Sequence, residues 1–466
     1  MNFTRFAKKI EGLQYLADKM ELSGSRVRRY LMQSTFCTRP DILQTDFDIL
    51  QKALDILSVP GSMPEVMQLR HLFTQVHDIQ GTLHALKEQH ILDEVELFEI
   101  KYFAALCTDF HKVCGLLGFH YENLHDLQEV QRLLDPHGAG TVSFYLYDCY
   151  SQSLSRAREL ATSIDPDREP EKWNSIQDRI REEELAVREM LSTKLSGMYP
   201  LLRDNFDRIA HIEIWFAKAN LAKRYGMVRP CIAVNGPDDA VLCIENMINP
   251  QIADTLGTIN KEFQPVSVTL KNGPCLLTGA NMSGKTVVLK TLALIQTLTQ
   301  FSFFVPAQSA SIPLVKDVFL VIGDKQDQYR GLSSFAAEML QLDRIMADIR
   351  QGIRLLLLVD EPARTTNPAE GAAILCALVE FLEHYNTMSL ISTHYGDLGL
   401  SCRKLRVSGF NPVQVKGRLD PLMMNEYMDY SLTEDKEGSV PMEALRIARL
   451  LGVDDAFIES AQRYVK

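Results

Sequence analysis

The chain has 466 residues, of which 46% are hydrophobic, and it carries a formal net charge of −11. Because a single hydrophobic core stops growing at about 250–300 residues, more than one domain is expected. The longest unbroken aliphatic run covers only residues 355–359, which excludes a transmembrane helix of about 20 apolar residues.

The cysteines and the first residues indicate where the protein resides. The nine cysteines include no C-x-x-C pair, and their odd number fits a reducing compartment better than a disulfide framework. The N-terminus leads into mixed charge without the apolar core of a signal peptide. A cytoplasmic protein without a membrane partner is therefore expected. The acidic balance gives no support for nucleic-acid binding, because proteins that neutralise phosphates usually carry a basic surplus or stripe.

The first half of the chain, residues 1–228, has the apolar spacing of helices. Apolar residues recur every three or four positions around residues 6–10 and again over 92–117. An all-α helical domain is therefore expected, with its boundary at residues 226–230. Pro and Gly residues predict interruptions at 134–140, 165–170 and Pro200, with helices over 145–162, 172–196 and 201–225.

From residue 231 onward, short apolar runs alternate with helical spacing. The runs predicted to be strands cover residues 266–270, 275–277, 355–359 and 389–392. Strands that alternate with helices are typical of a mostly parallel sheet with flanking helices. An α/β domain is therefore expected over residues 229–440, followed by two short helices, separated at Gly452, in the tail 441–466.

Residues 279–286 fit the phosphate-binding pattern G-x-x-x-x-G-K-[ST] at every defined position, between a predicted strand and a predicted helix. In such loops, backbone N–H groups surround a phosphate. Lys285 is predicted to bridge the β- and γ-phosphates, and the Thr286 hydroxyl to occupy a Mg²⁺ ligand position. The alternative, a chance glycine turn, does not account for the flanking strand and helix. The predicted nucleotide-binding residues are Gly279, Ala280, Asn281, Met282, Ser283, Gly284, Lys285 and Thr286.

Two adjacent carboxylates follow the apolar run 355–359. Open α/β sheets bind ligands at the carboxyl ends of their strands, and successive side chains on a strand point to opposite faces. Asp360 is therefore predicted to bind Mg²⁺, and Glu361 to be the general base that polarises the attacking water. The alternative, a solvated acidic strand end, is disfavoured by the apolar residues that lead into the pair.

His394 comes shortly after the apolar run 389–392 and is expected at the same sheet edge. A histidine after a strand is often only structural. Beside two nucleotide-binding motifs, we favour a sensor of the γ-phosphate.

These motifs together resemble the ATPase domain of the MutS family. The matching segments are 279–286 (the family's GPNMGGKS), 305–308 (Val-Pro-Ala-Gln), 323–339 (G…D…GxSTFxxEM), 360–371 (DExxRxTxxxxG) and 393–395 (THY). In the loop, Ala280 and Ser283 replace a proline and a glycine, changes that a backbone cradle tolerates. The resemblance implies an ABC-type P-loop NTPase that binds and hydrolyses Mg-ATP, and it adds Gln308 to the nucleotide-binding residues.

The resemblance also implies a dimer with composite sites. In this family two ATPase domains face each other, and a signature serine of one subunit reaches the γ-phosphate held by the other. Ser333 occupies the matching position. The tail 441–466 resembles the helices that help to build that dimer. The implied catalytic residues are Glu361, His394, Lys285 and Ser333, with ATP and Mg²⁺ as cofactors.

Three functions remain open at this point. The first is a DNA-associated ATPase of the mismatch-repair type, which closes around double-stranded DNA. The second is ATP-driven remodelling or reactivation of a protein partner, for example a cobalamin-dependent aminomutase, without DNA binding. It is favoured by the acidic balance and by the short turn 165–170, which leaves no room for the family's DNA clamp. The third is a dimer that binds nucleotide without hydrolysing it, which requires Glu361 to be idle.

A weaker pattern is formed by Cys107, His111 and Cys114, which are spaced to share one face of a helix. Three such ligands can approach a soft metal ion. The same spacing describes an ordinary buried helix face, which we favour.

Overall fold

The computed structural model describes residues 1–120, 124–140, 144–233, 240–280, 283–322, 334–395, 398–410, 427–435, 445, 448–449 and 451–464. The chain forms two compact units. A helical unit comprises residues 21–31 and 52–217, and a sheet-containing unit comprises residues 1–20, 32–51 and 218–466. The segment 1–228, predicted as one helical domain, thus contributes to both. No helix in the described ranges has the length and apolarity needed to cross a membrane.

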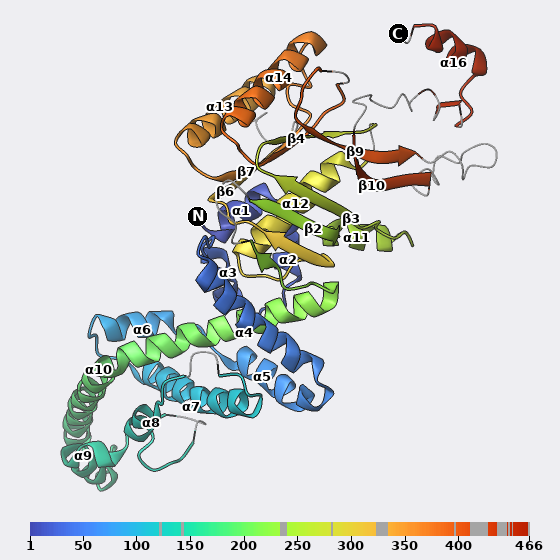
Figure 1. The fold of residues 1–466 in the computed structure, drawn as a ribbon. Helices are drawn as coiled ribbons and strands as arrows, with labels where there is room; N and C mark the ends of the chain where they lie inside the picture. Colours follow the sequence, from blue (N-terminus) through green and yellow to red (C-terminus); the bar gives the residue numbers. More distant parts are fainter. Residues whose placement is uncertain are drawn as a thin grey trace. The chain divides into compact units, whose positions relative to one another are not determined.

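The helical unit is built from amphipathic helices (Figure 1). Its elements are α5 (Met63–Gln75), α6 (Gln80–Lys87), α7 (Glu94–Leu116), α8 (Gln128–Leu134), α9 (Gln152–Thr162), the short 3-10 helices η1 (Pro60–Ser62) and η2 (Asp148–Tyr150), and parts of α3 (Ser25–Gln33), α4 (Pro40–Ser58) and α10 (Pro170–Tyr225). α7 begins at a capping box, in which Asp93 and Glu96 each accept the backbone N–H of the other. Its buried side chains include Phe103 and Phe110, and the helix predicted over 92–117 is confirmed.

Two of the predicted helix boundaries in this half are wrong. The helix predicted from residue 145 begins only at Gln152, since η2 precedes it. The interruption predicted at Pro200 is absent, because α10 runs through it as one helix of 56 residues, drawn as a bent ribbon in Figure 1. Leu195 and Leu202, on either side of Pro200, are fully buried, so tertiary packing outweighs the lost hydrogen bond. The break at 165–170 is confirmed, since α9 ends at Thr162 and α10 begins at Pro170.

The sheet-containing unit has two sheets and their covering helices. The strands are β1 (Cys231–Ile232), β2 (Val241–Met247), β3 (Val266–Lys271), β4 (Pro274–Thr278), β5 (Ser309–Ile312), β6 (Asp317–Ile322), β7 (Leu355–Asp360), β8 (Ser389–Ser392), β9 (Arg403–Phe410) and β10 (Met428–Glu434). The helices in the described part of this unit are α1 (Phe3–Lys9), α2 (Glu11–Lys19), α11 (Pro250–Gly257), α12 (Lys285–Gln300), α13 (Ser334–Arg350), α14 (Pro368–His384), α16 (Asp455–Gln462) and the remaining parts of α3, α4 and α10.

The larger sheet has six strands in the order β10-β9-β4-β8-β7-β6. Its neighbours from β9 to β6 are parallel, and only β10 is antiparallel, which confirms the mostly parallel α/β sheet. The strand predicted at 266–270 belongs instead to the smaller sheet, ordered β1-β5-β2-β3, where β3 pairs antiparallel with β2.

Helices α13 and α14 lie together on one side of the larger sheet (Figure 1). Their apolar side chains share a core cluster with alternate residues of β7, namely Leu355, Leu357 and Val359. Helix α12 packs along β6, β7 and β8. Helix α1 belongs to this unit because Phe3 and Phe6 contact the ring of Phe301, which follows α12. These contacts fix α12, α13 and α14 against the strands of the larger sheet.

Candidate functional site

The loop between β4 and α12 is shaped by two glycines. Gly279 and Gly284 have φ angles of +149° and +85°, which residues with a side chain rarely adopt. A Cβ at Gly279 would lie 2.8 Å from Oγ of Ser283, and one at Gly284 would lie 3.0 Å from Cδ1 of Tyr430. Because both spaces are filled, only glycine fits these positions without a shift of its neighbours.

The loop offers hydrogen-bond donors for an anion. The hydroxyl of Ser283 is buried and has no hydrogen-bond partner among the described residues. A buried polar group without a partner is uncommon in a protein interior. The loop also leads into the N-terminus of α12, where backbone N–H groups and the helix dipole favour negative charge. These features fit a bound phosphate group.

The end of β7 contacts this loop directly. Thr286, in the first turn of α12, donates a hydrogen bond of 2.7 Å from Oγ1 to Oδ2 of Asp360. The other carboxylate oxygen of Asp360 accepts a hydrogen bond of 2.5 Å from Oγ of Ser392, the last residue of β8. A hydroxyl and a carboxylate are oxygen ligands of the kind that Mg²⁺ prefers. The donor set therefore fits a magnesium ion beside the loop.

Glu361 is surrounded by cationic or ionisable side chains. Its carboxylate oxygens lie 3.7 Å from Nζ of Lys285, 3.7 Å from Nδ1 of His394 and 3.7 Å from a guanidinium nitrogen of Arg364. The side chains of Lys285 and Glu361 are 5% and 15% exposed, whereas that of Arg364 is 70% exposed. Water therefore screens the Lys285 pair least. Burial lowers the pKa of Lys285, and the charges of Glu361 and Asp360 oppose this effect.

The structure brings most of the predicted site residues together. Lys285 donates to the carbonyl oxygens of Gly279 and Ala280, at 2.8 and 3.0 Å, so its amine folds back over the loop. Gln308 lies instead beside the smaller sheet, is exposed, and accepts a hydrogen bond from Asn246. Three predicted residues lie outside the described part of the chain: Asn281, Met282 and Ser333.

Sequence reasoning missed two residues of this site. Ser392 was visible as the polar end of an apolar strand, but only the geometry shows that it links Asp360 to the backbone of Glu361. Tyr430 in β10 has no local signal, because it reaches Gly284 from a strand about 150 residues further along the chain. Its half-buried ring forms one wall beside the loop.

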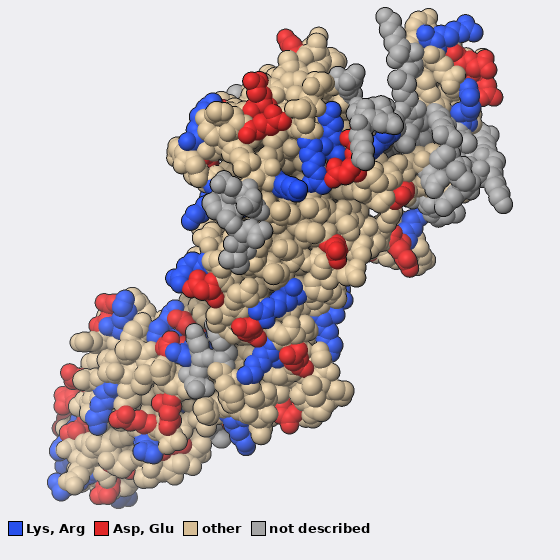
Figure 2. Space-filling model, in the orientation of Figure 1, with Lys and Arg blue, Asp and Glu red and all other residues tan. Residues whose placement is uncertain are grey.

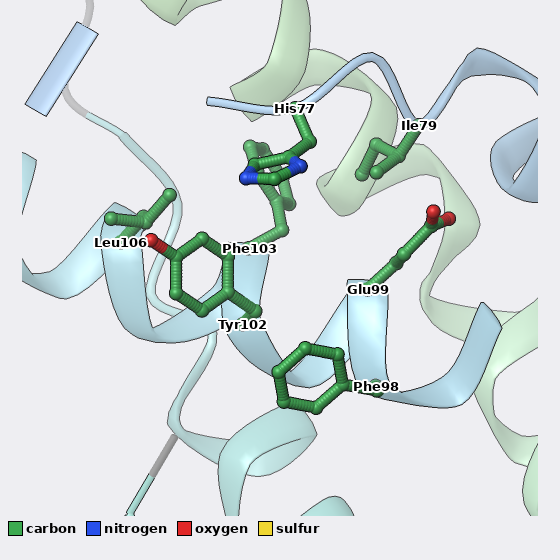
Figure 3. A pocket seen from close by; sticks show the side chains of 7 residues that line it. All are labelled: His77, Ile79, Phe98, Glu99, Tyr102, Phe103 and Leu106. Atoms are coloured by element: carbon green, nitrogen blue, oxygen red, sulfur yellow. The ribbon is translucent and has the colours of Figure 1, made fainter. Parts of the chain in front are cut away.

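A separate cavity of about 250 Å³ lies in the helical unit (Figure 3). Its lining is mainly aromatic and aliphatic and consists of His77, Ile79, Phe98, Glu99, Tyr102, Phe103 and Leu106. Phe98, Tyr102 and Leu106 are one turn apart on α7, and the carboxylate of Glu99 accepts a hydrogen bond from Thr82. The carboxylate of Glu99 in the wall therefore already has a hydrogen-bond partner.

The metal hypothesis for the helical half is wrong. The described ranges contain no cluster of three His, Cys, Asp or Glu residues suited to a metal ion. Cys107 and Cys114 are buried side chains of α7, and burial raises the pKa of both thiols, that of Cys114 to about 12. His111 is exposed. The pattern is that of an ordinary buried helix face.

Comparison with known proteins agrees with the site's motifs. The family model for MutS domain V matches residues 275–466. The DNA mismatch repair protein MutS of Bacteroides fragilis is 29% identical over 303 residues, which are 64% of this chain and 34% of that protein. The MutS of Dehalococcoides mccartyi is 32% identical over 230 residues, or 48% of this chain and 26% of that protein.

A relative named for a different activity is similar to a comparable share of this chain. The endonuclease MutS2 of Agathobacter rectalis is 30% identical over 275 residues, covering 58% of this chain and 32% of that protein. The matched regions span 26% to 34% of the length of these three relatives. Residues 275–466 thus match MutS domain V, an ATPase-type α/β domain, and the three relatives match over 48% to 64% of this chain.

Proposed function

We propose that the chain is an ABC-type P-loop ATPase that binds Mg-ATP at the carboxyl edge of the larger sheet and hydrolyses it. One observation carries the proposal. The hydroxyl of Thr286 and the carboxylate of Asp360 are joined at 2.7 Å, so the phosphate-type loop and the acidic end of β7 converge on one point. Such convergence of a glycine loop with an acidic strand end is the arrangement that holds a triphosphate and its metal.

Each side chain of the site has a chemical task in this proposal. The loop backbone and the buried hydroxyl of Ser283 bind phosphate oxygens, and Lys285 moves from the loop carbonyls to the β- and γ-phosphates. Thr286 and Asp360 hold Mg²⁺, which when bound neutralises charge on the phosphate oxygens. Glu361 accepts the proton of the attacking water, and His394, 3.7 Å away, senses the γ-phosphate.

The ring of Tyr430 suits the nucleotide base. It is half-buried, lies against Gly284 and belongs to the antiparallel edge strand next to the loop. An aromatic face beside a phosphate site offers a stacking surface of the kind that bases prefer. The proposed site thus extends from the base at β10 to the γ-phosphate at β7.

A dimer with composite sites completes the proposal. By family resemblance, Ser333 of the partner subunit contacts the γ-phosphate held by this chain. The tail 441–466 is proposed to contribute to the same dimer. Sedimentation with and without a non-hydrolysable ATP analogue tests this part, and a monomer under both conditions would contradict it.

Phosphate release is the test of the enzymatic proposal. Wild-type protein with Mg-ATP is expected to turn over, and Lys285→Ala is expected to lose turnover, because it removes the charge that contacts the β- and γ-phosphates. Turnover of Lys285→Ala at the wild-type rate would refute the assignment of the site.

Two macromolecular partners are proposed on which the protein uses the energy of ATP hydrolysis. The names of the MutS relatives support a role in mismatch repair, with closure of the dimer around double-stranded DNA. The net charge of −11 favours the second function, remodelling of a protein partner such as a cobalamin-dependent aminomutase. On the face drawn in Figure 2, basic and acidic side chains are interspersed over most of the described surface, and a phosphate-binding stripe would need basic side chains to predominate.

A salt titration of duplex binding separates the two partners. A protein that contacts phosphates loses affinity by orders of magnitude between about 50 and 200 mM salt. Fluorescence anisotropy with labelled duplex, with and without a non-hydrolysable ATP analogue, is the assay. Steeply salt-dependent binding supports the DNA function. Absence of binding at low salt would exclude the DNA function. Affinity capture with the ATP-loaded Glu361→Gln variant then tests the second function. Recovery of the chain alone, without another protein, would contradict it.

A further inference from the structure

The turn that follows β7 has an unusual backbone. Glu361 and Ala363 have φ angles of +47° and +57°, in the left-handed region that residues with a side chain rarely adopt. Neither residue is a glycine, so the strain is not relieved by a missing Cβ. A turn of this kind persists only where surrounding contacts hold it in place.

Two other elements hold the turn. The N–H of Glu361 donates to the hydroxyl and the carbonyl oxygen of Ser392 at the end of β8, at 3.0 and 3.2 Å. The N–H of Ala363 donates to Oε1 of Glu338 in α13, at 3.1 Å. The side chain of Ala363 is fully buried. The beginning of the turn is therefore fixed to β8, and its third residue to α13.

Glu338 lies on helix α13, which is packed into the core of the larger sheet. Leu342 and Ile345 follow Glu338 at helical spacing and are buried in the same core cluster as Leu357 of β7. Burial raises the pKa of Glu338, and the N–H of Ala363 opposes this effect. The carboxyl group is thus kept where burial disfavours its charged form, and its hydrogen bond goes to the strained turn.

We propose that Glu338 is a positioning residue for the catalytic base. By accepting the N–H of Ala363, it keeps the turn left-handed and holds the carboxylate of Glu361 beside Lys285 and His394. This inference rests on the function proposed above, in which Glu361 activates water. Without the acceptor, the turn relaxes toward a common backbone conformation, and the carboxylate two residues earlier moves away from the phosphate loop.

Three variants test the contact. Glu338→Ala removes the acceptor, Glu338→Gln keeps an acceptor oxygen of the same reach, and Glu380→Ala changes an exposed glutamate of α14 as a matched control. Hydrogen exchange measured by mass spectrometry reports the turn without requiring turnover. The peptide containing residues 361–366 is expected to exchange faster in Glu338→Ala and as in wild type in the other two variants.

Steady-state kinetics then tests the consequence. The kcat of Glu338→Ala is expected to fall about tenfold, the size of effect expected when a hydrogen bond that orients a reacting group is lost. The Kd for Mg-ATP, measured by calorimetry, is expected not to rise above the wild-type value, since the loop and metal ligands are unchanged and a displaced Glu361 competes less for Lys285. Glu338→Gln is expected to retain most of the wild-type kcat.

Several results would overturn the positioning role. They are a Glu338→Ala variant as active as Glu380→Ala, a Glu338→Gln variant as slow as Glu338→Ala, or a loss of nucleotide binding that accompanies the loss of kcat. If wild-type protein hydrolyses no ATP, the proposed function itself fails. The exchange measurement still decides whether Glu338 holds the turn, and unchanged exchange in Glu338→Ala would refute that contact.

Discussion

Replacing Glu361 by glutamine keeps the shape of the side chain but removes its charge and its capacity to accept a proton. If Glu361 is the general base, turnover falls by about 10² to 10⁴-fold, the usual contribution of such a group. The metal ligands Thr286 and Asp360 are untouched, so nucleotide binding is retained. The variant therefore separates binding from chemistry.

The structure also predicts that Glu361→Gln binds ATP more tightly. The carboxylate of Glu361 lies 3.7 Å from Nζ of Lys285, and both side chains are largely buried. At an effective dielectric constant of about 20, two charges at this distance attract by roughly 4 kcal/mol. ATP must compete with that attraction for Lys285. If about a third of it appears in binding, affinity for ATP rises about tenfold in the variant.

Two measurements check this prediction. Single-turnover hydrolysis of labelled ATP gives the chemical rate, and calorimetry with a non-hydrolysable analogue gives the affinity. Glu380→Gln, on the exposed face of α14, is the control and is expected to match wild type in both. A wild-type chemical rate in Glu361→Gln would show that another group activates water. Weaker binding would show that Glu361 supports the loop rather than opposing the nucleotide.

Three further predictions concern the metal, the packing and the pH dependence. Thr286→Val is expected to raise the Mg²⁺ concentration for half-maximal turnover about tenfold, since it removes a metal ligand; an unchanged Mg²⁺ requirement would contradict that role. Gly371→Ala places a Cβ 2.3 Å from the hydroxyl of Tyr395 and is expected to lower the free energy of unfolding, measured in urea, by about 1–3 kcal/mol. The control Gly81→Ala, which has open space around the new Cβ, is expected to cause no loss of stability. Equal stabilities of the two variants would contradict the close packing at Gly371. Burial lowers the pKa of Lys218 to about 7, so between pH 7 and its ordinary value of 10.5 the unfolded chain binds more protons than the folded one. The stability of wild type relative to Lys218→Met is therefore expected to rise above pH 7 by up to about 1.4 kcal/mol per pH unit, and a difference independent of pH in urea unfolding would show that the lysine stays charged.

The sequence predicted the elements that carry the phosphate-type loop because their signals are local. A strand buried on both faces reads as a continuous apolar run, as residues 355–359 do, and all five are buried. The carboxyl ends of parallel strands share one sheet edge, so the approach of Asp360 to Thr286 followed from two motifs about 75 positions apart. The strand at 266–270 was assigned to the wrong sheet, since an apolar run does not specify its pairing partner.

Pro200 shows where a local rule fails for a physical reason. Proline removes one helical hydrogen bond and crowds the preceding turn, a cost of about 3 kcal/mol. In α10 that cost competes with the burial of Leu191, Leu195 and Leu202 around the proline. Burying one leucine side chain contributes about 1.5–3 kcal/mol, so three of them outweigh the penalty and the helix continues. Whether the helix continues through Pro200 is decided by its packing partners. The sequence pattern of the helix itself does not identify them.

The strained turn after β7 was not predicted, because its own residues do not favour the backbone conformation that is observed. Left-handed backbone at Glu361 and Ala363 costs about 1–3 kcal/mol at each position, and turn rules expect glycine where φ is positive. The hydrogen bonds that offset this cost come from other elements. Ser392, which accepts the N–H of Glu361, lies 31 positions later in the sequence, and Glu338, which accepts the N–H of Ala363, lies 25 positions earlier. A conformation that depends on contacts so distant in the sequence cannot be predicted from the residues of the turn alone. Because both acceptors lie on other elements, the geometry of the proposed base depends on the packing of β8 and α13 against the turn.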